Sequence, residues 1–571
     1  MDNTTISRVF VQIADLLEIK GENPFRIRAY RTAAEVIANS AERLSGLDEP
    51  QLLRIPGIGK DLARKIQELA ATGHLAYHQA LLQEFPSSLI DILRLQGVGA
   101  KTVALLHTEL GVRTLEDLEH AARGGRLRDL RGMGARKEEL ILKALDERRR
   151  REGRHLMAHV ARSARGLIEY LQEIAPAVEF IPVGSLRRGC ETCGDLDVLA
   201  VGGTGDLMDR FAQYGLVERV LVKGDTKSSV MLRGGLQADL RLVPQESRGA
   251  AMQYFTGSKL HNIVLRDRAM QRGLKLNEYG LYRVESGERI GGATEEEIYE
   301  RLGLACVPPE LRENRGEIEA AEAHALPRLV ALEDLKGDLH AHTNVTDGRD
   351  DIEAMALGAR AAGLSYLAIT DHSQSLSMAN GLDERRALEH AARIRALNGR
   401  VEGVTLLAGI ECDIRPDGAM DLADDCLAQL DLVIASVHSA FNQDESQMTR
   451  RILRALECPF VDVLGHPTGR LILRREPYRV EMGKIIDAAA RQGVALEINC
   501  QVDRLDLNDA HARLARERGA NIVIATDAHA QAGFSALEWG ALVARRAWLR
   551  PEDVLNTKPV EEFQKLLRRH R

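Results

Sequence analysis

The chain has 571 residues and a mass of 63.0 kDa, which corresponds to about three to five domains at roughly 100–200 residues each. Its 44% hydrophobic and 28% charged residues are typical of globular proteins and exclude the disordered and fibrous classes. No run approaches the ~18 apolar residues that a membrane-spanning helix needs, and the N-terminus lacks a signal-peptide pattern. With seven scattered cysteines, we expect a reduced cytoplasmic protein without a membrane partner.

The formal net charge of −7 is unevenly distributed along the chain. Residues 301–571 carry 34 Lys and Arg against 42 Asp and Glu, whereas the first 300 residues are close to neutral. Because only local patches meet phosphates, this balance does not exclude a nucleic-acid partner. The acids of the C-terminal part are candidate metal ligands.

Residues 1–150 have apolar positions at helical spacing, with short glycine-containing turns between the expected helices. Three turns share the pattern apolar-x-Gly-apolar-Gly ahead of an amphipathic helix. Such a turn leaves backbone N–H groups at a helix N-terminus, where a DNA phosphate can bind without base recognition. Three copies favour this interpretation over plain packing hairpins. The candidate DNA-binding residues are Gly57, Gly59, Gly97, Gly99, Gly132 and Gly134.

Residues 155–300 mix strand-length apolar runs with helical segments, which predicts an α+β region. Asp195 and Asp197 alternate on an expected strand and therefore point to one face, and Asp239 lies in a second expected strand. Three converging carboxylates repel one another unless cations hold them, and two Mg²⁺ or Mn²⁺ ions suit in-line nucleotidyl transfer. A lone Asp-x-Asp is usually a solvated strand end.

A glycine-serine turn stands ten residues upstream of the two aspartates. Gly184 and Ser185 offer a backbone N–H and a hydroxyl to a triphosphate, and Arg188 is a better candidate phosphate ligand than Arg187. Cys190 and Cys193 form a Cys-x-x-Cys without a second pair, which is a weak zinc signal and is interpreted as structural.

From Leu335 onward, apolar runs alternate with helical segments, which predicts a parallel sheet and, at this number of repeats, a barrel. The helical segments are expected at 384–398, 420–430, 446–457, 481–492, 508–519 and 535–547. Imidazoles and carboxylates follow the apolar runs, and the carboxyl ends of barrel strands share one mouth. Nine such groups suffice for up to three Zn²⁺, Mn²⁺ or Fe²⁺ ions that activate water against phosphate esters. They are His340, His342, Asp347, His372, Glu411, His438, His466, Asp527 and His529.

Residues 5–315 resemble family X DNA polymerases, the group that includes DNA polymerase beta. The resemblance rests on GSLRRG at 184–189, GDLDV at 194–198 and YFTGS at 254–258, with Asn277, Glu278 and Tyr279 as a thumb signature. It implies that Asp195, Asp197 and Asp239 bind the catalytic metals. It further implies a set of nucleotide-binding residues: Gly184, Ser185, Arg188, Gly194, Tyr254, Phe255, Gly257, Asn262 and Arg266.

The chain departs from this family in two places near the carboxylates and in one place in the helical region. Gln237 stands where many eukaryotic members have an arginine that orients the third carboxylate, and a glycine-rich LRGGLQ replaces a more extended strand. Lys65 matches the family's Schiff-base lysine of 5′-deoxyribose phosphate lyase activity. Asp61, however, replaces a phosphate-binding lysine, which weakens that expectation.

The C-terminal pattern resembles the PHP (polymerase and histidinol phosphatase) domain, with all nine ligand positions filled. The whole chain thus resembles the bacterial and archaeal PolX group, and this resemblance implies a multidomain fold: helix-hairpin-helix domains, an α+β nucleotidyltransferase palm and thumb, and a distorted (β/α)7 PHP barrel. The expected domains are a lyase-like helical domain at 1–90, a fingers-type domain at 91–152, a palm at 153–250, a thumb at 251–315, a linker at 316–336 and a PHP domain at 337–571.

The expected function is template-directed filling of short gaps in DNA, joined to a Mn²⁺-dependent 3′–5′ exonuclease, with apurinic-site endonuclease or 3′-phosphatase activity as further options at the PHP site. The expected partners are gapped or nicked DNA and deoxynucleoside triphosphates, bound by a monomer that associates with the nucleoid in the cytoplasm. Three alternatives stay open: an untemplated nucleotidyltransferase, a DNA-end-binding scaffold with one active centre or none, and a PHP site that acts on small phosphate esters.

Overall fold

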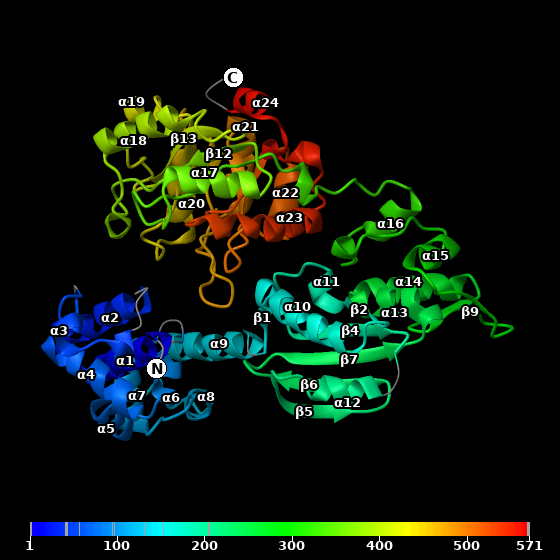
Figure 1. Cartoon of the computed structure of the whole chain (residues 1–571), viewed down its shortest axis with the longest axis horizontal. Coiled ribbons are helices and arrows are strands. Elements are labelled where there is room, and N and C mark those ends of the chain that lie inside the picture. The colour runs from blue at the N-terminus through cyan, green and yellow to red at the C-terminus, as the bar shows by residue number, and fades with distance from the viewer. Residues whose placement is uncertain are drawn as a thin grey trace. The chain divides into compact units, whose positions relative to one another are not determined.

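The computed structural model describes residues 3–39, 44–55, 57–93, 95, 98–130, 132–151, 153–203 and 206–567. The chain forms two compact units, Met1–Glu152 and Gly153–Arg571 (Figure 1), and each is treated by itself. No helix in the described ranges is both long and apolar enough to cross a bilayer. No disulfide joins the seven cysteines, which all lie in described ranges.

The first unit is all-helical, as expected from its apolar spacing. Two apolar clusters form its core, one around Phe10 and Ile66 and one around Leu106 and Leu118. Its helices are α1 (Asn3–Lys20), α2 (Pro24–Asn39), α3 (Glu49–Leu52), α4 (Lys60–Thr72), α5 (Ala76–Glu84), α6 (Ser88–Leu93), α7 (Ala100–Leu110), α8 (Leu115–Arg123) and α9 (Ala135–Arg151).

The second unit begins with a palm built on a five-stranded sheet of order β2-β4-β7-β6-β5. Its central strands β4 and β7 run parallel, and the other neighbours are antiparallel. Helix α10 covers the sheet through Val160 and Leu167. The elements are β1 (His155–Leu156), α10 (Met157–Ile174), β2 (Glu179–Pro182), α11 (Gly184–Arg187), β3 (Thr192–Cys193), β4 (Asp195–Val201), α12 (Asp206–Ala212), β5 (Val217–Lys223), β6 (Lys227–Leu232), β7 (Gln237–Val243) and α13 (Arg248–Thr256).

The thumb follows as a small three-stranded sheet with helices. The turn between β8 and β9 is closed by the Asn277 side chain, which accepts hydrogen bonds from the N–H groups of Tyr279 and Gly280. Ile318 and Leu329, in the range expected as a linker, pack in the apolar cluster of the thumb. The elements are α14 (Lys259–Gln271), β8 (Leu274–Asn277), β9 (Gly280–Arg283), β10 (Arg289–Gly291), α15 (Glu295–Arg301) and α16 (Glu317–Glu322).

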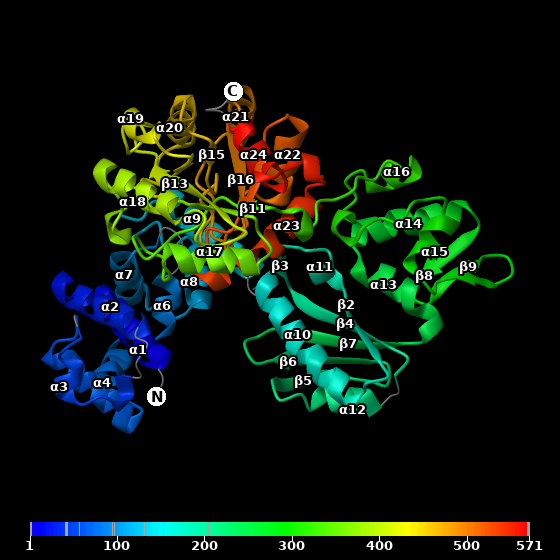
Figure 2. The ribbon, with the colours of Figure 1, turned by 45° about the horizontal axis from the view of Figure 1, so that its top comes forward.

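The C-terminal part is a nearly closed barrel of seven parallel strands in sequence order, β11 to β17. A bridge between Ala341 and Ala528 joins the segments that follow the first and last strands, and the helices lie outside the strands (Figure 2). The strands are β11 (Gly337–Asp338), β12 (Tyr366–Ile369), β13 (Thr405–Asp413), β14 (Leu432–Ser436), β15 (Val463–Leu464), β16 (Ala495–Asn499) and β17 (Ile522–Ala525). The helices are α17 (Ile352–Ala361), α18 (Glu384–Leu397), α19 (Asp424–Leu427), α20 (Glu445–Glu457), α21 (Met482–Gln492), α22 (Asp509–Glu517), α23 (Leu537–Arg546) and α24 (Val560–Leu566).

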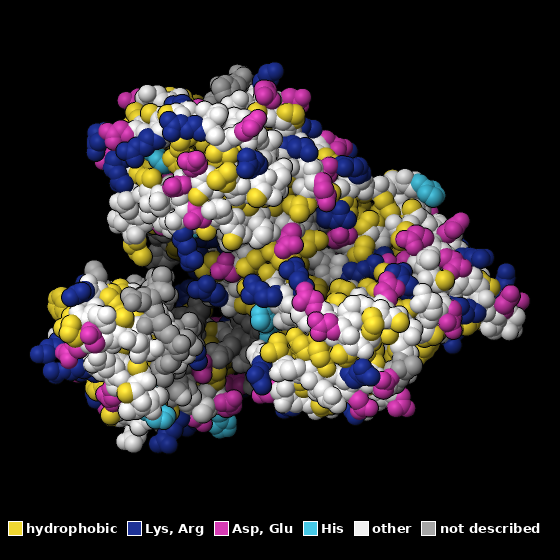
Figure 3. All heavy atoms as spheres, in the orientation of Figure 1, with side chains coloured by type: hydrophobic (Ala, Val, Ile, Leu, Met, Phe, Trp, Pro, Cys, Tyr) yellow, Lys and Arg dark blue, Asp and Glu magenta, His cyan; other side chains and the backbone are white. Residues whose placement is uncertain are grey.

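One expected helix of the barrel is much shorter than its range. The segment 420–430 contains only the four-residue α19, because the preceding chain makes a turn in which Ile414 bridges to Met420. The other five expected helices match α18 and α20 to α23 to within three residues at either end. On the face drawn in Figure 3, Lys and Arg side chains are interspersed with Asp and Glu, so contacts with a polyanion depend on local groups.

The thumb is held to the palm by a buried ion-pair network. Arg312 is fully buried and its Nη1 lies 2.5 Å from Oε1 of Glu295, which also accepts hydrogen bonds from Arg187 at 2.9 and 2.6 Å. Burial alone would raise the pKa of Glu295, but the two guanidinium groups lower it to about 2. The stability that this carboxylate contributes is therefore complete above pH 5 and is lost as the pH falls towards 2.

We predict that Arg312→Met lowers the opening free energy of the thumb by about 3 kcal/mol, because one partner of a buried ion pair is removed. Hydrogen–deuterium exchange of α14 and α15 measures the change. The double variant Arg312→Met with Glu295→Gln should recover part of the loss, since the buried charge is gone as well. Unchanged exchange in the single variant would contradict the assigned role of the pair.

Candidate active sites

Three carboxylates meet at the start of the paired strands β4 and β7. In the parallel register, Asp197 lies beside Asp239, and Asp195 lies beside Gln237. Burial first, and then the charges of Asp195 and Asp239, raise the pKa of Asp197 to about 6. The fold itself leaves this negative charge partly uncompensated, so a divalent cation fits the donor set of hard oxygens. The sequence expectation of one carboxylate cluster agrees with this register.

The third carboxylate is oriented by two neighbours. Gln237 donates a hydrogen bond from Nε2 to Oδ1 of Asp239 at 2.9 Å, and the Lys227 ammonium lies 3.1 Å from Oδ2. Gln237 stands where many eukaryotic family members have an arginine. Here its side-chain amide makes the orienting contact with Asp239. The glycine-rich segment before it forms the turn between β6 and β7.

A cavity of about 520 Å³ opens beside the carboxylates. Gly184 faces Asp197 closely, because a Cβ at Gly184 would lie 2.8 Å from Oδ2 of that aspartate, and its φ of +68° favours glycine. Asp239 and Gly194 do not line this cavity. Its lining consists of Gly184, Ser185, Arg188, Asp195, Asp197, Tyr254, Phe255, Thr256, Gly257, Lys259, Asn262 and Arg266.

The side chains across the cavity are held by their own hydrogen bonds. Asn262 donates to the Tyr254 carbonyl at 2.7 Å and accepts from Gln253 at 2.7 Å. The rings of Tyr254 and Phe255 meet edge to face at 5.0 Å. Arg187 points to the thumb, where it binds Glu295, so it does not line the cavity, in agreement with the preference for Arg188.

Lys65 on α4 forms an ion pair with Asp61 one helical turn earlier. Its ammonium lies 5.3 and 4.9 Å from the ring centroids of Tyr30 and Tyr77. Although burial would lower the pKa of Lys65, hydrogen bonding to Asp61 and Tyr30 raises it. A raised pKa keeps the amine protonated, which opposes nucleophilic attack.

The glycine turns of the first unit precede helices as expected. Gly59 and Gly99 are the N-cap residues of α4 and α7, and neither helix has a side-chain cap. Gly57 and Gly132 have φ of +90° and +81°, a region that favours glycine, and Gly134 directly precedes α9. Gly97 lies outside the described residues.

The nine expected ligands of the barrel converge at its mouth. Eight of them fall into three groups whose ligand atoms lie within 4.8 Å of one another, and the ninth, His466, reaches Glu411 with its Nε2 at 3.0 Å. The groups are His342, Asp347, His372 and His529; His340, His342 and Asp527; and His372, Glu411 and His438.

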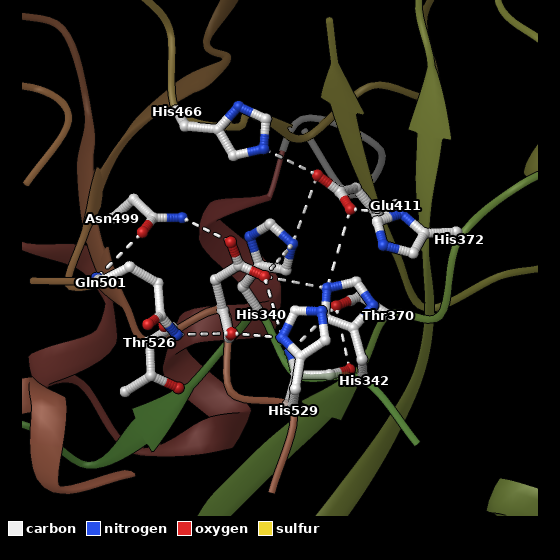
Figure 4. A network of polar contacts seen from close by, with 12 residues as sticks. His340, His342, Thr370, His372, Glu411, His466, Asn499, Gln501, Thr526 and His529 are labelled. Atoms are coloured by element: carbon white, nitrogen blue, oxygen red, sulfur yellow. Dashed lines mark hydrogen bonds and ion pairs between the residues drawn. The ribbon is translucent and has the colours of Figure 1, made fainter. Parts of the chain in front are cut away.

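Glu411 is the centre of this cluster and is only 1% exposed. Its carboxylate lies between His466 and His372 (Figure 4), 2.8 Å from Nδ1 of His372 and 3.3 Å from Nε2 of His438. Burial opposes protonation of both imidazoles, but nearby carboxylates raise their pKa values. Glu411 and Asp347 raise the pKa of His372 to about 10, and Glu411 and Asp413 raise that of His438 to about 9. Without metal, both imidazoles are therefore protonated at neutral pH.

The imidazole donors fit metal ions. Nε2 of His340 and Nδ1 of His342 are buried without a hydrogen-bond partner, and an unsatisfied buried nitrogen is costly unless a metal or water binds it. Imidazole and carboxylate together suit Zn²⁺, Mn²⁺ and Fe²⁺. The donor set therefore supports a centre that binds more than one divalent ion.

Two acids that the sequence reasoning missed orient the ligands. Glu497 accepts from Nδ1 of His340 at 2.7 Å and from the backbone N–H of His466 at 2.5 Å. Asp413 accepts from Nδ1 of His438 at 3.0 Å. Such partners fix the tautomer and the direction of a metal-binding imidazole. The sequence did contain a signal for both acids: Glu497 interrupts the apolar run VALEIN, and Asp413 ends the run AGIECD.

A second cavity of about 520 Å³ adjoins the barrel cluster at Asp527 and His529. Arg349 and Arg504 line it, together with Gln501, which donates to the carbonyls of Thr526 and Asp527 at 2.8 Å. Guanidinium groups next to a metal cluster are suited to the phosphates of a substrate.

Comparison with known families agrees with this division of the chain. A helix-hairpin-helix domain matches residues 1–75, and a SAM-like helix-hairpin-helix tandem matches 89–147. The DNA polymerase beta palm matches 150–262, the DNA polymerase beta thumb 251–313, and the PHP domain 338–501. These matches confirm the expected fold class.

The chain is similar to several characterised or named proteins. It is 38% identical over its full length to the DNA polymerase/3′-5′ exonuclease PolX of Bacillus subtilis, which is also covered completely. DNA polymerase lambda of Rattus norvegicus is 25% identical over 54% of this chain and 56% of its own length. A protein of Thermoanaerobacter named as a probable phosphatase is 29% identical over 38% of this chain and 89% of its own length.

We predict that Gln237→Ala lowers the rate of nucleotide incorporation by roughly tenfold, the effect typical of losing a partner that orients a metal ligand. Single-turnover incorporation at saturating nucleotide measures it. Gln237→Arg should retain most of the rate, because a guanidinium also donates to Asp239. An unchanged rate in Gln237→Ala would show that Lys227 alone orients this carboxylate.

We predict that Mn²⁺ binding to the barrel releases protons at pH 8, because the raised pKa values of His372 and His438 keep both imidazoles protonated without metal. Calorimetry in buffers of different ionisation enthalpy counts the protons. The release should fall as the pH approaches 10. The matched variant Asp239→Asn should leave it unchanged, and metal binding without proton release would contradict the assigned charge state.

Proposed function

The chain belongs to the PolX group of family X DNA polymerases, and we propose that it fills short gaps in DNA by template-directed nucleotidyl transfer and trims 3′ ends with a Mn²⁺-dependent exonuclease in its PHP barrel. One observation carries this proposal. The same chain holds a palm carboxylate cluster beside a nucleotide-sized cavity and a complete nine-ligand cluster in the barrel.

In the palm, we assign the metals to Asp195, Asp197 and Asp239. When bound there, Mg²⁺ or Mn²⁺ supplies the positive charge that a triphosphate and an attacking 3′-hydroxyl require. We assign Ser185 and Arg188, which line the cavity, to the triphosphate, and Tyr254 and Phe255, which also line it, to the sugar. We assign Asn262 and Arg266 of the same lining to the nascent pair.

In the barrel, we assign up to three metals to the nine ligands. When bound, they supply a water molecule of lowered pKa as the nucleophile. Arg349 and Arg504 bind phosphates of the strand in the adjoining cavity, and Glu497 and Asp413 hold His340 and His438 in the orientation for ligation. The tautomers follow from these hydrogen bonds.

The partners follow from the two sites. The helix-hairpin-helix turns at Gly57, Gly59, Gly99, Gly132 and Gly134 bind the phosphates of gapped or nicked DNA through backbone N–H groups. Deoxynucleoside triphosphates enter the palm cavity. Each described site is complete within one chain, which favours a monomer.

A second candidate concerns the barrel alone. Two relatives that match 38% of this chain are named probable phosphatases, so removal of a 3′-phosphate by the same metal cluster is a further proposal. Both reactions use one cluster and one substrate end. A 5′-labelled primer with a 3′-phosphate separates them, since dephosphorylation changes mobility without removing a nucleotide.

We predict that Asp239→Ala lowers synthesis at least about 100-fold and spares nuclease activity, whereas His340→Ala has the reverse effect, since each removes a metal ligand of one site only. The assay uses a gapped duplex with a 5′-labelled primer and Mn²⁺, with and without deoxynucleotides. Extension and shortening report the two sites separately. Loss of both activities in either variant would contradict two independent sites.

A further inference from the structure

The last turn of α23, the helix that follows the final barrel strand, reaches the nucleotide-binding loop of the palm. Both lie in the second compact unit, and α23 lies next to α11 and β3 (Figure 2). Gly189, with a φ of +67°, faces α23, and a Cβ there would lie 3.4 Å from Leu542 and 3.7 Å from Cδ of Arg546, which is ordinary van der Waals contact. The loop and the helix therefore lie in direct contact at this point.

Arg546 makes several of the polar contacts across this boundary. Its Nη1 donates to the backbone carbonyl of Arg188 and to Oε1 of Glu313, both at 2.9 Å. Its Nη2 lies 3.0 Å from Oδ2 of Asp509 on α22. The side chain is only 10% exposed, so these contacts are shielded from water and are worth more than those of a surface ion pair.

Glu313, which pairs with Arg546, also holds the side chain of Arg188. Nε of Arg188 donates to the same Oε1 of Glu313 at 3.0 Å, and its Nη1 donates to the Thr256 carbonyl at 2.5 Å. One carboxylate oxygen is therefore shared between an arginine of the nucleotide cavity and an arginine of the barrel. Thr256 is the last residue of α13 and also lines the cavity.

Apolar contacts fix the same boundary. Met157 at the start of α10 is buried in the apolar cluster of the barrel, and Leu186 of the nucleotide loop packs against it. On the other side, Trp548 after α23 packs in the cluster of the thumb. Glu191 adds an ion pair with Arg470 at 2.7 Å. The barrel thus contacts the nucleotide loop through apolar and charged groups, on either side of a cavity of about 240 Å³ that Gly189 and Arg546 line.

We propose that Arg546 is a positioning residue of the polymerase site: the nuclease barrel supplies the group that sets the nucleotide loop and the Arg188 side chain for triphosphate binding. The inference rests on the proposed polymerase function. It assigns the PHP domain a second task that does not depend on its metals. Arg546 acts on the triphosphate through Arg188 and Glu313, and it does not touch the nucleotide itself.

The expected effect is on nucleotide binding more than on turnover. Without Arg546, Glu313 is neutralised by Arg188 alone, and the Arg188 carbonyl loses its donor, so the loop samples conformations that do not face the triphosphate. Loss of hydrogen bonds to charged groups of this kind corresponds to roughly a tenfold weaker interaction. The carboxylates on β4 and β7 lie outside this network, so the chemical step changes little.

The test measures gap filling by the full-length chain as a function of deoxynucleotide concentration. Arg546→Met should raise KM about tenfold and lower kcat less than about threefold, while its exonuclease rate stays near that of the wild type at a temperature below the melting transition of both proteins. Arg546→Lys should restore part of the KM, because an ammonium can reach Glu313. The control is Arg395→Met on α18. This variant also removes a barrel arginine, one that pairs with Asp431 at 2.7 Å.

A double-variant comparison tests the route. If Arg546 acts through Arg188, adding Arg546→Met to Arg188→Met should raise KM less than about twofold further, since contacting residues are not additive. Additive effects on KM would overturn the proposal. So would an unchanged KM in an active Arg546→Met protein, or an equal fractional loss of the synthesis and exonuclease rates in that variant. Absence of synthesis by the wild-type protein would overturn the proposed function, and this inference with it.

Discussion

The structure depends on bringing ionisable side chains into close contact at two sites that are partly shielded from water. Carboxylates gather at the start of β4 and β7, and imidazoles with carboxylates gather at the mouth of the barrel. Like charges in a poorly solvated site raise one another's energy, as the raised pKa of Asp197 records. The hydrogen-bonded strands fix the backbone against this repulsion, and divalent cations remove it. Metal binding is therefore coupled to the charge state of each cluster.

The two clusters meet this constraint in different ways. In the palm, a parallel register sets Asp197 beside Asp239, and neutral or positive neighbours, Gln237 and Lys227, orient the more deeply buried acid. In the barrel, the ligands come from many strand ends, and a central acid, Glu411, collects imidazoles that protons can charge when metal is absent. The palm leaves an open cavity for a triphosphate. The barrel surrounds its candidate ligands with protein, and a cavity opens beside Asp527 and Arg504.

Much of this could be predicted from local sequence, and what could not has a common physical cause. Alternation along DLDV places two carboxylates on one face, and acids and histidines at the ends of apolar runs mark the barrel mouth, because both patterns depend on the period of a strand. The role of Glu497 is set by partners at the ends of other strands, and the engagement of Arg187 with Glu295 spans 108 residues. Such pairings depend on how the elements pack, which no periodicity records.

The same limit explains why the link between the two sites is invisible in the sequence. Arg546 and Arg188 are 358 residues apart, and neither the barrel pattern nor the palm motifs contain a signal that they meet. Once Glu313 is shared between them, the nucleotide loop cannot move without breaking contacts to α23, the helix that starts eight residues after the barrel ligand His529. The helix α23, which belongs to the framework of the nuclease barrel, therefore also supports the nucleotide loop of the polymerase site. This shared support is a physical reason for keeping both sites in one polypeptide.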